Sequence, residues 1–229
     1  DLTESNLAAT DQSLDTCTNN FCTLNPLDLT ADITLSEGNL KAVYGTSGTR
    51  DVQVSTFGVS SGKWYWEIKI GGAESPNNAT LGITQNSDDS AIVLGGNTDN
   101  SWEYRGYDGK VYHNAGSLVT YATFTEDNII GVYLDLDNHK LYFSKDGSLQ
   151  SATGIDLDTG HDYFPAISDA GSSATPSFEM NFGSPSFAIS TSNADDNSYG
   201  NFEYSPNITG DGSAKSFYAL NTKNLAEFG

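Results

Sequence analysis

The sequence predicts an all-β fold, because side chains alternate between two faces with a period of two in three separate stretches. The clearest is Ser61–Ile70, where one face would carry Trp64, Trp66, Ile68 and Ile70, and the other Tyr65, Glu67 and Lys69. The same alternation recurs in Ile129–Leu136 and in Phe178–Phe182. Successive side chains of an extended chain point to opposite faces, so each stretch is typical of a half-buried β-strand.

The first part of the chain is expected to be an arm followed by short strands. Residues 1–30 are polar and rich in Asn, Asp and Thr, which favours an extended arm with at most one helical turn near Leu7–Ala9. Glycine-containing turns then separate short apolar stretches, since glycine tolerates the positive φ that tight turns require. Strands are expected at Ile33–Leu35, Leu40–Tyr44, Val52–Phe57 and, after the tryptophan-rich strand and a turn-rich loop over 71–78, at Thr80–Thr84.

The second part should continue as hairpins and loops. Tyr107-Asp-Gly-Lys110 lies between two β-forming stretches, which predicts a hairpin of Tyr104–Gly106 with Lys110–His113. The polar stretch 85–100 contains an apolar patch, Ala91–Leu94, which would be a short strand or a loop over the sheets. Strands are also expected at Leu141–Phe143, which should pair back on Ile129–Leu136, and at Ile155–Leu157 and Phe164–Ile167. The polar segments 191–201 and 205–216 are predicted to be surface loops.

Five motifs, taken in order, resemble the signature of the SPRY domain, a relative of the concanavalin A-like lectins. They are Gly62–Glu67 (GKWYWE), Ile130–Asp137 (IGVYLDLD), Leu141–Gly147 (LYFSKDG), Tyr163–Ala166 (YFPA) and Asn181–Gly183 (NFG). The resemblance implies a bent antiparallel β-sandwich with extended N- and C-terminal arms. The expected division is an N-terminal arm at 1–30, a sandwich at 31–190, and a C-terminal loop and tail at 191–229.

The flanks of this region, Cys17–Pro26 and Ala219–Leu225, resemble SPRY-containing proteins of tailed bacteriophages. That resemblance implies a virion location and a non-enzymatic binding module in a tail fibre, tailspike or decoration protein. Its partner would be a host cell-surface protein or glycan. The alternative is a structural subunit whose arms contact neighbouring virion subunits. A homo-oligomer stays open under both interpretations. The single methionine, Met180, agrees with a processed product or an excised fragment.

Composition excludes several classes of partner. Thirty acidic residues against ten basic ones give a formal net charge of −20, which argues against binding to nucleic acid or to anionic lipid. No run of apolar residues is long enough for a transmembrane helix, so membrane insertion is not expected. The simplest interpretation of the charge is solubility. The more specific interpretation is that the carboxylates coordinate calcium or repel a wrong surface.

The sequence offers no clear metal site, cofactor motif or defined disulfide. Cys17 and Cys22 enclose four residues, so a disulfide and two free thiols both stay open, and no histidine lies near enough for zinc. Oxygen-bearing side chains cluster in Asp156–Asp162, Ser87–Asp89 and Asp195–Asp196, without the spacing of a twelve-residue calcium loop. We therefore predict no cofactor and no metal ligand.

Catalytic residues are not predicted either. The G-x-S-x-G motif of serine hydrolases is absent, and His139 and His161 are expected in solvated turns or loops. Only the expected fold supports a carbohydrate-active enzyme. Asp135 and Asp137 share one face, but they lie at the outward end of a structural strand and do not form an obvious catalytic pair.

The best candidates for recognition lie in one aromatic and polar stretch. Tyrosine and tryptophan offer an apolar face with a hydrogen-bonding tip, which suits sugars and protein surfaces alike. In SPRY domains the loops at one end of the sandwich form the binding surface, which here implies loops near 77–79, 86–100, 107–109 and 168–176. The predicted ligand-binding residues are Trp102, Tyr104, Tyr107, Tyr112 and His113, with a purely structural role for Trp102 and Tyr104 as the alternative.

Overall fold

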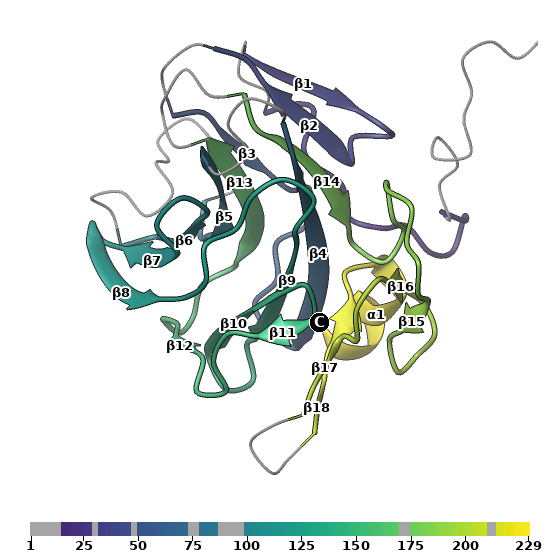
Figure 1. Ribbon diagram of the computed structural model, residues 1–229. Helices are drawn as coiled ribbons and strands as arrows, with labels where there is room; N and C mark the ends of the chain where they lie inside the picture. The colour runs from purple at the N-terminus through teal and green to yellow at the C-terminus, as the bar shows by residue number, and fades with distance from the viewer. Residues whose placement is uncertain are drawn as a thin grey trace, which may run out of the picture.

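The structure is a computed structural model that describes residues 15–28, 32–46, 50–72, 78–86, 99–169, 175–209 and 214–229. Two antiparallel sheets face one another, and one short helix, α1 (Thr222–Phe228), lies near the C-terminus (Figure 1). The predicted all-β antiparallel sandwich is therefore confirmed. The predicted turn at Leu7–Ala9 and the patch at Ala91–Leu94 lie outside the described residues.

The larger sheet holds the tryptophan-rich strand β4 (Lys63–Gly71) near its centre. Strand β19 (Tyr218–Ala219) adds to β4 in parallel, and β12 (Ile155–Asp156) pairs with β10. The order along this sheet is β1 (Ile33–Ser36), β2 (Lys41–Tyr44), β14 (Ser177–Asn181), β4, β9 (Ile129–Asp135), β10 (Lys140–Lys145) and β11 (Ser148–Leu149).

The second sheet has six strands and carries the recognition candidates. Its order is β3 (Val52–Val54), β13 (Phe164–Asp169), β5 (Ala79–Thr84), β6 (Ser101–Arg105), β7 (Lys110–His113) and β8 (Gly116–Thr120). Two short pairs complete the described strands, β15 (Asn193–Ala194) with β16 (Asn201–Phe202) and β17 (Asn207–Ile208) with β18 (Lys215–Ser216).

Strand β8 is an element that the sequence analysis missed. It follows β7 through a two-residue turn, Asn114–Ala115, in which both residues have positive φ, 48° and 56°. That conformation matches the twist of a hairpin, but it is ordinarily signalled by glycine. Alanine at the second position gives no such signal. The hairpin of β6 and β7 could therefore be predicted from its Asp-Gly turn, whereas the hairpin of β7 and β8 could not.

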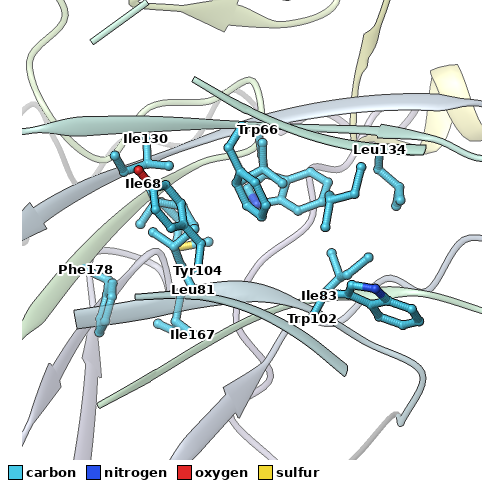
Figure 2. Close-up of a cluster of buried hydrophobic side chains, with 14 of the residues drawn as sticks. Trp66, Ile68, Leu81, Ile83, Trp102, Tyr104, Ile130, Leu134, Ile167 and Phe178 are labelled. Carbon is cyan, nitrogen blue, oxygen red and sulfur yellow. The ribbon is translucent and has the colours of Figure 1, made fainter. Parts of the chain in front are cut away.

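The core between the sheets is built around the predicted tryptophans. Trp64 and Trp66 are both fully buried, and Trp64 donates its indole N–H to the carbonyl oxygen of Ser61 at 2.7 Å. Figure 2 shows Trp66 and its neighbours on the larger sheet facing the side chains of the second sheet across the core. The predicted inner face of β4 is therefore the one that lies in the core.

The opposite face of β4 corrects one prediction. Tyr65 and Glu67 were expected on the exposed side of a half-buried strand, but both are fully buried. The residues that cover them come largely from the C-terminal segment, which was predicted to be surface loop and tail. We call this second apolar group the outer cluster; it comprises Phe21, Tyr65, Tyr133, Tyr142, Phe202, Ile208, Phe217 and Ala219.

Glu67 fastens the C-terminal segment to the sheet. One carboxylate oxygen accepts from the Tyr65 hydroxyl at 3.0 Å and from the backbone N–H of Tyr204 at 2.7 Å. The other accepts from the Asn181 side-chain amide at 3.0 Å and from the backbone N–H of Glu203 at 2.9 Å. Burial raises the pKa of Glu67, and the four donors offset part of that shift.

The two arms lie side by side against the domain. Residue Phe21 forms a bridge with Asn221, and the backbone N–H of Cys22 donates to the carbonyl oxygen of Leu220 at 3.0 Å. A second buried carboxylate, Asp195, accepts from the N–H groups of Tyr199, Gly200 and Ala219 and from the side chain of Asn224. The division at residues 30 and 190 stays a prediction, although the described parts of both arms are packed on the sandwich.

The two cysteines are free thiols in the structure, Cys17 exposed and Cys22 buried, so the disulfide alternative is not the one adopted. Burial raises the pKa of the Cys22 thiol to about 11. A buried thiol with a raised pKa is protonated and inert near neutral pH, because the thiolate is the reactive form.

Replacing Glu67 by glutamine should destabilise the domain by about 2 kcal/mol. The NH2 group of the glutamine would face buried N–H groups that now donate to the carboxylate, and those donors would lose their acceptor. Chemical denaturation monitored by tryptophan fluorescence measures this change. Glu126→Gln is the matched control, because Glu126 is exposed, and it should shift the free energy of unfolding by less than about 0.5 kcal/mol. Equal effects of the two variants would show that the Glu67 contacts contribute nothing to stability.

Titration with an aromatic disulfide reagent should detect the Cys17 thiol at once in the native protein and the Cys22 thiol only after unfolding. The reason is the burial of Cys22, which leaves it about 0.1% ionised at pH 8. In a Cys17→Ser variant, the native protein should not react. A native protein without reactive thiol that gains two on reduction would instead demonstrate a disulfide.

Candidate functional site

The five predicted recognition residues separate onto two faces of the second sheet. They do so because side chains alternate along β6 and β7. Trp102, Tyr104 and His113 are directed toward the inside of the sandwich, whereas Tyr107 and Tyr112 lie with Arg105 on its outside. Tyr104 is fully buried against Phe124 and donates its hydroxyl to the carbonyl oxygen of Ala122. Tyr104 therefore belongs to the core, as the structural alternative stated.

A cleft of about 400 Å³ opens beside Trp102 and His113. One wall comes from β6, β7, β8 and Tyr121, and the other from the β11–β12 loop and β12, so both sheets contribute to the cleft. The lining is largely apolar, with hydroxyl groups at its rim, and its residues are Trp102, His113, Leu118, Val119, Tyr121, Ser151, Thr153, Gly154, Ile155 and Asp156.

A stacked pair forms part of the cleft wall. The rings of Trp102 and His113 lie 4.2 Å apart with an angle of 12° between their planes, and Trp102 itself is 1% exposed. His113 Nδ1 lies 3.0 Å from the carbonyl oxygen of Ser101, which can only accept, so Nδ1 carries a proton. In the neutral ring this leaves Nε2 as a hydrogen-bond acceptor. The wall thus combines an apolar surface with a polar group of fixed orientation.

The outer face carries a separate polar cluster. The guanidinium of Arg105 lies 3.9 Å from the centre of the Tyr112 ring and donates to the Tyr107 hydroxyl at 3.2 Å. Arg50 and Arg105 both approach Oε2 of the buried Glu103, at 3.4 and 3.0 Å. The Tyr112 hydroxyl donates to Asp108 at 2.8 Å. These contacts fix the side chains to one another, and Tyr107 is the most exposed of them at 45%.

Among the described residues, the other two histidines and the carboxylates Asp135, Asp137 and Glu67 have structural or solvent-exposed settings. His139 and His161 are exposed, as predicted for solvated turns and loops. Asp135 is buried and accepts from the backbone and side chain of Asn138, while Asp137 pairs with Lys63. Glu67 is buried with a raised pKa, yet its oxygens are occupied by four donors, so it is a structural carboxylate.

Metal-ligating residues do not gather in the part of the chain that the structure describes, where no group of three or more His, Cys, Asp or Glu could hold an ion. Of the predicted oxygen clusters, Asp195 binds backbone amides and Asp156 pairs with Lys140 at 2.6 Å. The cluster at Ser87–Asp89 lies outside the described residues, as do most of the predicted loops at 86–100 and 168–176.

Sequence reasoning missed the rest of the cleft. Leu118 and Tyr121 lie on and just after β8, and Ser151–Asp156 come from the other sheet. Leu118 is 49% exposed, which is unusual for leucine on a strand. Leu118 and Thr120 are two positions apart, as residues on one face of a strand are, and this spacing could have suggested a strand. No local pattern indicated that this strand would lie against the β11–β12 loop.

Two face-to-face antiparallel sheets define a β-sandwich, a scaffold on which loops and edges are the usual places for binding sites. The family model of the SPRY domain matches residues 63–185, more than half of the chain, so the chain belongs to the SPRY domain family. The predicted family is thereby confirmed.

Solved structures support the same fold. The SPRY domain of human HERC1 matches with a TM-score of 0.60 and 21% identity over 69% of this chain and 96% of that chain. The PSpry domain of TRIM65 matches with 0.57 and 15% over 70% of this chain and 92% of that chain. Stonustoxin matches with 0.54 and 22% over 70% of this chain and 27% of the toxin chain. At these identities the likeness shows the fold alone.

Exchanging Trp102 for alanine should destabilise the fold by about 3–5 kcal/mol, as expected for a buried tryptophan. Tyr107→Ala, the control at an exposed neighbouring position, should cost less than about 0.5 kcal/mol. Urea denaturation followed by circular dichroism measures both. A small loss for Trp102→Ala would mean that the indole is not held in the core as described.

Proposed function

We propose that this domain is a non-catalytic recognition module that binds another macromolecule through the cleft beside Trp102 and His113. SPRY domains in general serve as protein-interaction modules, and this chain belongs to that family. The observation that carries the proposal is the cleft itself, an apolar hollow rimmed by hydroxyl groups and an imidazole acceptor. Binding sites commonly combine such a surface with a few fixed polar groups.

The placement of the arms supports a tethered module. Strands β7 and β8 lie on the left of the domain in Figure 1, whereas α1, β15 and β16 lie on its right. The N-terminal arm reaches the same region as α1, since Asn20 and Thr222 exchange two hydrogen bonds. A chain that is attached near α1 would therefore present the cleft away from its attachment.

The finer proposal is that the module belongs to a phage virion protein, as a tail fibre, tailspike or decoration segment, and contacts a host cell-surface protein or glycan. The resemblance of Cys17–Pro26 and Ala219–Leu225 to flanks of phage SPRY proteins supports this context. A net charge of −20 keeps the chain soluble and disfavours anionic partners. No helix among the described residues is long and apolar enough to cross a membrane.

The alternative, assembly contacts with neighbouring virion subunits through the arms, has less support. The middle of the described N-terminal arm is occupied by contacts within the chain, since Phe21 lies in the outer cluster and Leu24 bridges to Ser55, whereas Leu27 is exposed. The C-terminal segment is similarly packed on β4. The parts of the described arms that are folded onto their own domain are not available to another subunit.

Binding of the fluorescently labelled protein to permissive host cells should fall at least tenfold in a Thr153→Arg variant, since a bulky cation at this exposed position fills the cleft. Thr34→Arg on β1 is the matched control, because Thr34 is exposed at the opposite edge of the larger sheet from β11, and it should bind as the unmodified protein does. Flow cytometry provides the measurement. Full binding by Thr153→Arg would remove the cleft from the proposed function.

The virion location is tested separately, by labelling intact particles with an antibody to the domain.

A further inference from the structure

Strand β8 forms a free edge of the six-stranded sheet. It is last in the strand order and pairs only with β7 among the described strands. Gly116, Ser117, Leu118 and Thr120 are exposed and Val119 is half-buried. An edge of this kind presents unpaired backbone N–H and C=O groups, which are a template for another strand.

The other outer strands are protected. Strand β3 is buried and covered by the N-terminal arm, because Asn25 donates to the carbonyl oxygen of Val54 at 2.9 Å and accepts from Gln53. Strand β11 has two residues. Strand β1 is flanked in sequence by Asp32 and Glu37, and charge near an edge discourages pairing.

Strand β8 lacks the cover and the charges that protect the other outer strands, and its pairing with β7 contains one register shift, between Val111 and Tyr112. Residues 115–125 contain no charged side chain and no proline, in a chain with thirty acidic residues. Leu118 and Val119 line the cleft together with Trp102 and His113. The free edge and the cleft are therefore one continuous surface, so a strand added to β8 would direct alternate side chains toward the cleft.

We propose that β8 binds an extended, basic segment of a partner protein, which adds to the six-stranded sheet as a further strand and places apolar side chains in the cleft. Main-chain hydrogen bonds would supply affinity and the cleft would supply specificity, as in other cases of strand addition. The inference rests on the proposed function of the cleft and specifies the chemistry of its partner.

Charge selects the partner. A second copy of this chain would bring another −20 charges and would be repelled, and an acidic segment would be repelled likewise. Asp156 at the cleft rim is 91% exposed while it pairs with Lys140, so its carboxylate can also meet an incoming cation. A glycan is less suited, because the face of Trp102 is covered by His113 and unavailable for stacking on a sugar ring.

Amide hydrogen exchange tests the proposal with a capped synthetic peptide of repeated Lys-Val units, which is basic on one face and apolar on the other when extended. At peptide concentrations well above the dissociation constant, exchange of the amides in Gly116–Thr120 should slow about tenfold, because paired amides exchange only when the complex opens. The amides of β1 should not change. Peptides of Glu-Val and of Lys-Pro units are the controls, since one reverses the charge and the other lacks half of the N–H groups.

Leu118→Lys should abolish this protection, because a charge on the edge prevents strand addition, while Val43→Lys, at a comparably exposed site on β2, should preserve it. Absence of protection of β8 at millimolar peptide, or equal protection by the Glu-Val peptide, would overturn the proposal. Host binding that is lost in Thr153→Arg without any protection of β8 would leave the cleft function in place and reject strand addition alone. Protection by an N-acetylated glycan in place of the peptide would also reject it.

Discussion

The carboxylate of Glu67 is the contact on which the arrangement of the whole chain depends. It is fully buried in the outer face of β4, and its two oxygens accept four hydrogen bonds, two of them from the backbone of Glu203 and Tyr204. A buried carboxylate is costly unless such donors are supplied. Two of the four donors reach Glu67 only when the C-terminal segment crosses the sheet at this point, so Glu67, together with Asp195, holds that segment in position.

This constraint decides which surfaces stay available. Once the C-terminal segment is in place, the outer cluster closes one face of the larger sheet. The N-terminal arm closes the edge at β3 through Asn25 and Leu24. The exposed strand β8 lies on the opposite side of the sandwich from α1 (Figure 1). The cleft beside Trp102 adjoins β8.

The elements that could be predicted from the sequence were those determined by local patterns. Trp64 and Trp66 alternate with their neighbours, and that period identifies a strand and its inner face without further information. The burial of Tyr65 and Glu67 could not be predicted in the same way, because the residues that cover them lie more than a hundred positions away. Trp102 and His113 were identified as candidates, but their stacking depends on the pairing of β6 with β7. Leu118 was missed because the turn before β8 is Asn-Ala, which lacks the glycine that ordinarily indicates such a turn in the sequence.

The C-terminal segment also supports the cleft. Tyr142 belongs to the outer cluster and accepts a hydrogen bond from Lys215 at 2.9 Å. Its ring lies against Gly154 of the β11–β12 loop, where an added Cβ would come within 2.6 Å of the ring, and the positive φ of 69° also favours glycine. Gln150 of the same region accepts from the backbone N–H of Ala122, just beyond β8. Both walls of the cleft are thus connected to each other and to the tail, so a recognition surface made of a loop and an edge strand can keep a fixed shape without a strand on the outer side of β8.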